Sequence, residues 1–166
     1  MEYSPFVLDI EHASGTNLLE TCRELGVAVV CYSPLGRGLL TGAITGRESV
    51  SGENDFRGQQ FPRFSEENIE ANVKLVSHFT AFADKKGCTS SQLAIAWILK
   101  QSDDIIPIPG TKKAKYLEEN WSSLDIHLTD EEEKEVRKFV ESAEVLGYRS
   151  IATGKAHAFV DTKEEA

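Results

Sequence analysis

The sequence predicts an α/β domain whose parallel sheet is covered by helices. Short apolar runs alternate with stretches that carry apolar residues at helical spacing, which is typical of strands joined by crossover helices. The clearest run, 27–32 (VAVVCY), is apolar on both of its alternating faces, as expected of a parallel strand buried on two sides. A turn rich in proline and glycine follows it, as is common at the end of such strands.

The first elements of the chain are a short strand and a helix. Residues 3–8 carry enough apolar side chains for a short strand. Gly15-Thr16 offers a helix start and Gly26 offers a stop. The residues between them include an apolar row at helical spacing: Leu18, Cys22 and Leu25. The strand over 27–32 follows directly.

The next segment, 40–64, lacks any apolar periodicity. A connection of this length is unusual inside a compact domain and is usually functional or disordered. Ser65 then predicts a helix N-cap, with Glu66 and Glu67 favourable at its positive end. An apolar stripe follows at helical spacing: Ile69, Val73, Val76, Phe79 and Ala83. The run Lys85-Lys86-Gly87 predicts the end of this helix.

Three further helices and a third strand complete the pattern. Thr89 and Gln92 fit a capping box that opens an apolar helix over 93–99, which we expect to lie between neighbours. Residues 105–109 predict a buried strand in which each proline removes a backbone donor and so limits pairing to the other edge or the strand end. A helix follows over 114–124. A second capping box, Thr129-Asp130-Glu131-Glu132, opens a solvent-facing helix with three apolar residues, Val136, Phe139 and Val140.

The charge balance excludes two classes of partner. The chain of 166 residues has 27 acidic against 18 basic residues, and this net charge of −9 opposes binding to nucleic acids and to anionic membranes. No apolar stretch approaches the roughly 20 residues that span a bilayer, and the N-terminus is acidic and polar, unlike a signal peptide. We therefore expect a cytoplasmic protein.

The cysteines and histidines predict neither a disulfide framework nor a metal site. The cysteines are odd in number and lack C-x-x-C spacing: Cys22, Cys31 and Cys88. The histidines are scattered without a ligand pattern: His12, His78, His127 and His157. We assign no metal ligand.

The turn after the strand over 27–32 carries chemistry suited to an anion. It combines Pro34, Gly36 and Gly38 with Arg37 between the glycines. Ligands bind at the carboxyl ends of parallel strands, and glycines there let backbone N–H groups approach an anion such as a phosphate. An ordinary tight turn is the alternative, since proline and glycine punctuate most such connections.

The strand over 105–109 ends in a similar way. Gly110, Thr111, Lys112 and Lys113 place a hydroxyl and two cations just before a helix, whose N-terminus itself attracts anions. A chance pair of exposed lysines is the alternative for Lys112 and Lys113. Because two strand ends are both suited to phosphate, each supports the interpretation of the other.

Together these motifs resemble the aldo-keto reductase family. The branch it resembles most carries YSPLGRGLLTG after the seventh barrel strand and IPGTKK, followed by LEEN, after the eighth; the chain has these runs at 32–42, 108–113 and 117–120. Its EYS at 2–4 resembles the sixth strand. The resemblance implies the C-terminal part of a (β/α)8 TIM barrel, incomplete, with about three βα units and C-terminal helices over 1–146. Residues 147–166 are then expected to be a mobile C-terminal tail.

The resemblance also implies an NADP(H) site. Tyr32 would stack on the nicotinamide ring, and the pyrophosphate would be lined by the residues of the first turn: Ser33, Pro34, Leu35, Gly36, Arg37, Gly38 and Leu39. Gly110, Thr111 and Lys112, with Lys113 beside them, would meet the ribose and its 2′-phosphate, and Glu119 and Asn120 would hold the adenine. A lysine at the extra phosphate favours NADPH over NADH. Tyr116 stands where many members place an arginine against that phosphate or the adenine.

Family chemistry passes a hydride from nicotinamide to a carbonyl while a tyrosine, helped by a lysine, a histidine and an aspartate, donates the proton. In the family those four residues come from earlier strands, so we assign no catalytic residue to this chain, which resembles a fragment of a barrel of about 250 residues or more. The expected function is an NADPH-dependent aldo-keto reductase, of which this chain retains the cofactor-binding part. The alternative is a non-catalytic nucleotide-binding module or half of a split barrel, like a channel β subunit. The expected partners are a small carbonyl substrate and the missing barrel half.

Overall fold

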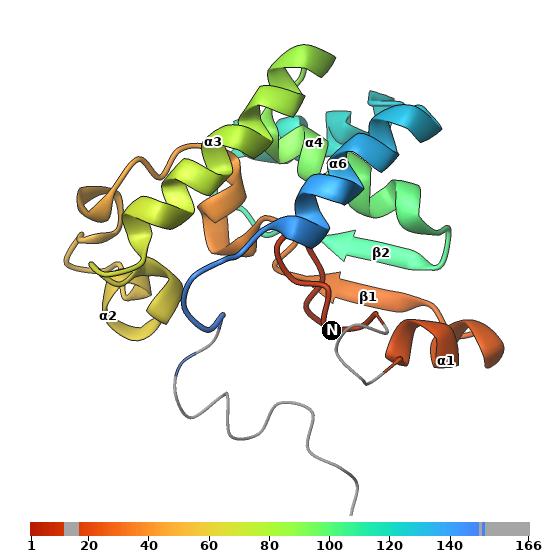
Figure 1. Cartoon of the computed structure of the whole chain (residues 1–166), viewed down its shortest axis with the longest axis horizontal. Coiled ribbons are helices and arrows are strands. Elements are labelled where there is room, and N and C mark those ends of the chain that lie inside the picture. Colours follow the sequence, from red (N-terminus) through yellow and green to blue (C-terminus); the bar gives the residue numbers. More distant parts are fainter. Residues whose placement is uncertain (12–16, 150, 152–166) are drawn as a thin grey trace, which may run out of the picture.

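The computed structural model describes residues 1–11, 17–149 and 151. Its elements follow in this order: α1 (Leu18–Glu24), β1 (Val29–Tyr32), η2 (Gly36–Thr41), η3 (Arg47–Val50), α2 (Arg57–Gln60), η4 (Pro62–Phe64), α3 (Ile69–Lys86), α4 (Ser90–Gln101), β2 (Ile105–Ile108), α5 (Ala114–Trp121), η5 (Ser122–Asp125) and α6 (Asp130–Ser142). Helices α3, α4 and α6 lie on one side of the two strands (Figure 1). The predicted helix start at Gly15-Thr16, and the predicted tail from residue 150 onward apart from Ile151, lie outside the described residues.

The two strands pair in parallel, which confirms the predicted class of sheet. The register runs from Val29 opposite Ile105 to Tyr32 opposite Ile108, and the chain crosses between the strands through α3 and α4. β1 begins two residues later than predicted. The reason is that the N–H of Val27 donates to the Cys22 carbonyl at the end of α1 (2.8 Å) and is not available to the sheet.

Pro107 lies inside β2 without breaking the sheet. The N–H of Val29 donates to the Asp104 carbonyl (2.7 Å), and in a parallel ladder with this register the N–H groups of Ile106 and Ile108 also face β1. The nitrogen of Pro107 therefore faces the opposite edge of β2. The proline is tolerated because its missing donor falls on the edge that does not pair with β1.

The strand predicted over 3–8 is wrong. Ser4 and Val7 pair with each other across a tight turn, with the Ser4 N–H donating to the Val7 carbonyl (3.1 Å) and the Val7 N–H to the Ser4 carbonyl (2.9 Å). Pro5 favours this turn because its ring fixes φ and supplies no N–H to a ladder.

Only the first two residues of the chain run beside β1. The amino group of Met1 donates to the Val30 carbonyl (2.8 Å), the Tyr32 N–H donates to the Met1 carbonyl (2.9 Å), and Glu2 bridges to Tyr32 in parallel. The described residues therefore have two strands and two isolated bridges, where the sequence predicts about three βα units.

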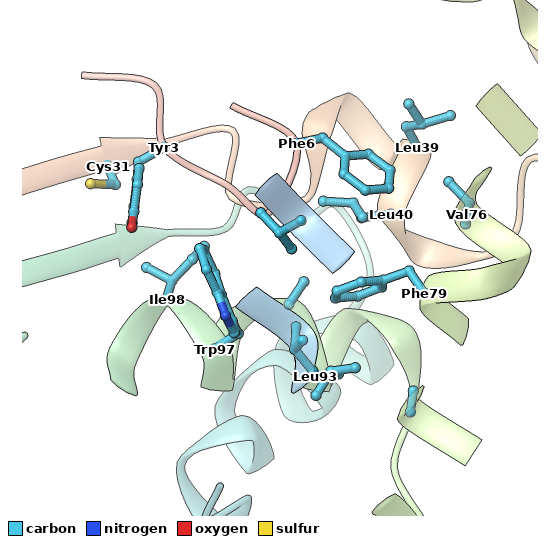
Figure 2. Close-up of a cluster of buried hydrophobic side chains, with 14 of the residues drawn as sticks. Tyr3, Phe6, Cys31, Leu39, Leu40, Val76, Phe79, Leu93, Trp97 and Ile98 are labelled. Carbon is cyan, nitrogen blue, oxygen red and sulfur yellow. The ribbon is translucent and has the colours of Figure 1, made fainter. Parts of the chain in front are cut away.

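The hydrophobic core lies between one face of the sheet and the helices above it (Figure 2). The rings of Tyr3 and Trp97 have centroids 6.0 Å apart, and Phe6 meets Phe79 edge-on at the same separation. Helix α4 is buried along most of its length, which confirms that it lies between neighbours. Aromatic pairs of this kind contribute beyond the area that they bury.

The other face of the sheet is open. Its side chains are about half exposed: Val30 49%, Tyr32 42%, Ile106 48% and Ile108 51%. The opposite face, which carries Val29, Cys31 and Ile105, is buried. The predicted burial of both faces is therefore wrong for the described residues, because helices cover only one of them. An apolar patch of this kind typically marks an interaction surface.

Most of the predicted helix boundaries are found where the sequence places them. In both capping boxes the threonine accepts from the N–H three residues on, and the side chain of Gln92 or Glu132 accepts from the threonine N–H. Gly87 ends α3 in the left-handed conformation (φ 76°). The predicted start at Ser65 is wrong, because the N–H of Asn68 donates to the Ser65 carbonyl (3.1 Å) in a turn, and α3 begins only after Asn68.

The aperiodic segment 40–64 folds into short helical turns. Ile44, Val50 and Phe64 are buried in the core, and the Arg47 guanidinium donates to the Phe64 carbonyl (3.1 Å). Turns of three to six residues carry no repeating apolar pattern, so periodicity does not reveal them.

Residues 147–149, which the sequence assigns to the tail, contact the rest of the domain. Arg149 forms ion pairs with Glu2 (2.9 Å) and Asp9 (2.6 Å), and its side chain is 10% exposed. Arg63 donates to the Gly147 carbonyl (3.3 Å). The contacts of the domain therefore continue past Leu146.

Candidate functional site

A cleft of about 780 Å³ opens at the carboxyl ends of both strands. Its lining comes from the turn after β1, from the segment 40–64, from the start of α4, and from β2 through α5: Ser33, Pro34, Leu35, Arg37, Gly38, Thr41, Ala43, Arg57, Thr89, Ser91, Ile108, Pro109, Gly110, Thr111, Tyr116, Glu119 and Asn120. The volume lies within the range of sites for cofactors and other small ligands. Two strand ends that are more than 70 residues apart in sequence thus contribute to one cleft.

The turn after β1 is built from residues in the left-handed region. Positive φ values occur at Ser33 (52°), Gly36 (56°), Arg37 (57°) and Gly38 (91°). Two of these residues are not glycine, and such conformations for other residues are characteristic of functional sites.

The glycines do not act in the way that the sequence suggests. The N–H of Gly36 donates to the Ser33 carbonyl (2.9 Å), and that of Gly38 donates to the Leu35 carbonyl (3.0 Å). Both donors are occupied within the turn, so the expected approach of glycine N–H groups to an anion is wrong. The glycines close the turn, and the charge that faces the cleft comes from side chains.

Arg37 is the exposed cation of this turn. Its guanidinium lies over the Phe61 ring, 4.3 Å from the centroid. Within the described part of the chain, no carboxylate lies within ion-pair distance of Arg37. The left-handed φ of this residue and the ring beneath the guanidinium hold the charge beside the cleft, where it can pair with an anion.

Arg57 is a second arginine at the cleft, and the sequence analysis missed it. It donates to the Arg37 carbonyl (2.9 Å) and pairs with Asp55 (2.6 Å). The hydrogen-bonded Arg57 guanidinium holds the pKa of the Asp55 carboxyl below its usual range. Arg57 thereby joins the segment 40–64 to the turn after β1. Its position in an aperiodic segment gives no sequence signal for this role.

The end of β2 supplies Gly110 and Thr111 to the cleft. The Thr111 hydroxyl accepts from the Lys113 N–H (3.2 Å), which shapes the entry into α5. Lys112 and Lys113 are exposed and lie outside the lining; the Lys113 ammonium lies 5.6 Å from the centroid of the Tyr116 ring. Both lysines are therefore at the rim, and Tyr116 is a lining residue that the sequence analysis did not assign.

The far end of the cleft is formed by α5 and the start of α4. Glu119 and Asn120 both line it, and Asn120 is 8% exposed. The Thr89 hydroxyl donates to Glu119 Oε1 (2.7 Å). Ser91, from the same end of α4, is buried against the cleft. Here the structure brings together two residues predicted for adenine and two that were not predicted.

Besides Lys112 and Lys113, three residues of the predicted site lie outside the lining. Leu39 is fully buried and Gly36 is buried beneath the turn, so both support it from below. Tyr32 lies on the open face of the sheet, directly before Ser33, which lines the cleft. No helix among the described residues has the length and hydropathy to cross a membrane, and no cluster of three potential metal ligands occurs among them.

The described residues thus form an α/β domain with a cleft at the carboxyl ends of two parallel strands. The chain matches the aldo/keto reductase family over residues 1–141. It therefore belongs to the aldo/keto reductase family, whose members are oxidoreductases with an α/β barrel fold.

Two relatives carry this family name. The chain is 44% identical over 162 residues to the aldo-keto reductase yakc [NADP(+)] of Schizosaccharomyces pombe, which covers 98% of this chain and 47% of the relative. It is 48% identical over 154 residues to the aldo-keto reductase str7 of Strobilurus tenacellus, with 93% and 45% covered. The chain thus spans about half the length of these relatives.

Solved structures give the same assignment. The glycerol dehydrogenase AKR11B4 from Gluconobacter oxydans matches with a TM-score of 0.71 and 27% identity over 85% of this chain and 41% of that chain. The thermostable aldo-keto reductase Tm1743, solved with the inhibitor epalrestat, matches with a TM-score of 0.56 and 25% identity over 83% and 38%. The two parallel strands described above are consistent with an incomplete barrel of this family.

Proposed function

We propose that this chain is the C-terminal, cofactor-binding part of an NADP(H)-dependent aldo-keto reductase that reduces a carbonyl to an alcohol. The observation that carries the proposal is the Arg37 guanidinium, which pairs with no carboxylate among the described residues and lines a cleft that joins two strand ends. A dinucleotide is long and anionic, so it requires a cleft that several elements line together and at least one cation free of carboxylate partners. The NADP(+) in the name of the yakc relative supports the choice of cofactor.

Each part of the cleft has a proposed role. The cleft-lining residues of the first turn contact the pyrophosphate, with Gly36 and Leu39 supporting them from below, and Arg37 pairs with its charge. Gly110, Thr111 and Lys112 meet the ribose and 2′-phosphate, with Lys113 beside them. Glu119 and Asn120 hold the adenine, and Tyr32 supports the nicotinamide ring from the open face of the sheet. The bound cofactor supplies the hydride, while these residues bind it and fix its orientation.

We assign the proton donor to a part of the protein outside this chain. Family resemblance places the tyrosine, lysine, histidine and aspartate on earlier strands, and no residue here is proposed to replace them. The chain therefore binds the cofactor without reducing a substrate, and the substrate is a small carbonyl compound in the whole protein.

A second candidate is half of a split barrel that binds nucleotide without turnover. The open face of the sheet favours it, because Val30, Ile106 and Ile108 are each about half exposed and apolar. The proposed partner is the other half of the barrel, which covers this face and pairs with the edge of β2 opposite β1. Burying such side chains is worth about 1.5–3 kcal/mol each when burial is complete.

The proposed 2′-phosphate contact predicts a specific effect of Lys112→Glu. The variant should lose about tenfold or more in NADPH affinity and much less in NADH affinity, because only NADPH carries the extra phosphate. Fluorescence titration with each nucleotide measures both. Lys138→Glu, an equal charge change at an exposed position on α6, is the control and should leave the ratio of the two affinities unchanged. Equal losses for both nucleotides in the Lys112 variant would contradict the proposed contact.

A further inference from the structure

The capping residue of α4 makes a second contact that its role as a cap does not require. Thr89 Oγ1 accepts from the Gln92 N–H (3.2 Å), which is the capping contact. The same hydroxyl donates its proton to Glu119 Oε1 (2.7 Å) on α5. A hydroxyl has one proton to donate, so this group is committed to the carboxylate while its lone pair serves the helix.

Gln92, the partner of Thr89 in the capping box, is also linked to Glu119, through the side chain of Ser122. Gln92 Oε1 accepts from the Thr89 N–H (2.9 Å), and its Nε2 donates to Ser122 Oγ (2.8 Å). The Ser122 hydroxyl in turn donates to the Glu119 carbonyl (3.0 Å). The start of α4 therefore holds both the carboxylate and the backbone of Glu119 at the edge of the cleft.

A carboxylate fixed in this way has a defined chemical preference. One oxygen is occupied by Thr89, and within the described chain the hydrogen bonds of Glu119 leave the other oxygen available. An ionised carboxylate only accepts hydrogen bonds. It therefore favours a base with an amino group at this point over one with a carbonyl, whose oxygen it repels.

We propose that Thr89 is a positioning residue that orients the Glu119 carboxylate and thereby makes the cleft select a 6-amino purine over a 6-oxo purine. The inference rests on the proposed function, because it assumes that the base of NADP(H) lies beside Glu119. It adds that the selection between the two purine bases depends on Thr89, the N-cap of α4, which acts through Glu119.

Three substitutions at Thr89 separate positioning from capping. Thr89→Ala removes the cap and the donor. Thr89→Asp keeps a strong cap and replaces the donor with a negative charge beside Glu119, whereas Thr89→Asn keeps a cap and an amide donor. Thr129 provides a matched control, because it caps α6 with the same kind of capping box and is not among the residues that line the cleft.

The experiment measures the dissociation constants of NADPH and of its hypoxanthine analogue, deamino-NADPH, by fluorescence titration of the chain. The wild type should prefer NADPH by about tenfold, the scale of one hydrogen bond to a charged group. Thr89→Ala and Thr89→Asp should reduce that preference to about threefold or less, and Thr89→Asn should restore it. Thr129→Ala should lower the thermal midpoint and leave the preference unchanged.

The outcomes distinguish the positioning role of Thr89 from the proposed binding of NADP(H). A Thr89→Asp chain that folds, binds NADPH and keeps the full preference overturns the positioning role and leaves the proposed cofactor in place. A wild-type chain with no NADPH affinity overturns the proposed function, and the role of Thr89 falls with it.

Discussion

Replacing Arg37 with glutamate should weaken NADPH binding about 30-fold or more, the equivalent of about 2 kcal/mol. The guanidinium lies beside the cleft over the Phe61 ring, and no carboxylate among the described residues neutralises it. The variant removes a charge-assisted contact and adds repulsion between the new carboxylate and the pyrophosphate. Because the pyrophosphate is common to NADPH and NADH, both affinities should fall together, unlike the selective effect expected at Lys112.

Two control variants test whether the loss of affinity is specific to the charge of Arg37. Lys74→Glu reverses a charge at an exposed position on α3 and should change the affinity less than twofold, since exposed charges remote from the site are screened by salt. Arg37→Gln should show an intermediate loss, because it removes the charge without adding repulsion. An Arg37→Glu chain with an unchanged thermal midpoint and wild-type affinity would place the phosphates elsewhere.

Replacing Asn72 with alanine should lower the free energy of unfolding by about 3 kcal/mol. Asn72 is fully buried on α3, and its amide donates to the carbonyls of Arg63 (2.9 Å) and Leu146 (2.9 Å). Its carbonyl accepts from the Leu146 N–H (2.9 Å). Alanine leaves three partly buried backbone groups without these partners, and each unsatisfied group is costly.

Urea denaturation measures this effect. Ser77→Ala is the matched control on the same helix, because the exposed Ser77 hydroxyl bonds only within the helix, to the Lys74 carbonyl (2.7 Å). It should change the unfolding free energy by no more than about 0.5 kcal/mol. A loss below about 1 kcal/mol for Asn72→Ala would contradict this expectation. It would mean that the contact between α3 and Leu146 is lost at little cost in free energy, or that water replaces the Asn72 side chain.

The parts of the fold that the sequence predicts best are those with local signals. The capping boxes at Thr89 and Thr129 and the stop at Gly87 depend on a few neighbouring residues, and each is found where predicted. The segment 40–64 shows the opposite case, because its short turns are held by distant contacts such as that of Arg47 with the Phe64 carbonyl. No local pattern encodes a contact of this kind.

The sequence predicts the location of the cleft better than the contacts that form it. Glycine-rich strand ends correctly indicate where the cleft lies, since Arg37 and Gly110 both line it. The predicted glycine donors are instead used to close the turn, because a chain with φ in the left-handed region brings its own carbonyls within reach. Arg57 and Thr89 reach the cleft only through tertiary packing, so their spacing in sequence carries no information about it.

Titration of the chain with NADPH in the presence of an aldehyde such as 4-nitrobenzaldehyde, followed by nucleotide fluorescence, tests the central claim most directly. One trace reports both events, since binding changes the fluorescence on mixing and oxidation to NADP⁺ removes it with time. The account predicts a saturable change that then stays constant, because the proposed function gives this chain the cofactor cleft and places the proton donor in another part of the protein. A trace without saturable binding would contradict the proposed cleft, and a steady loss of fluorescence would contradict the assignment of catalysis to another part of the protein.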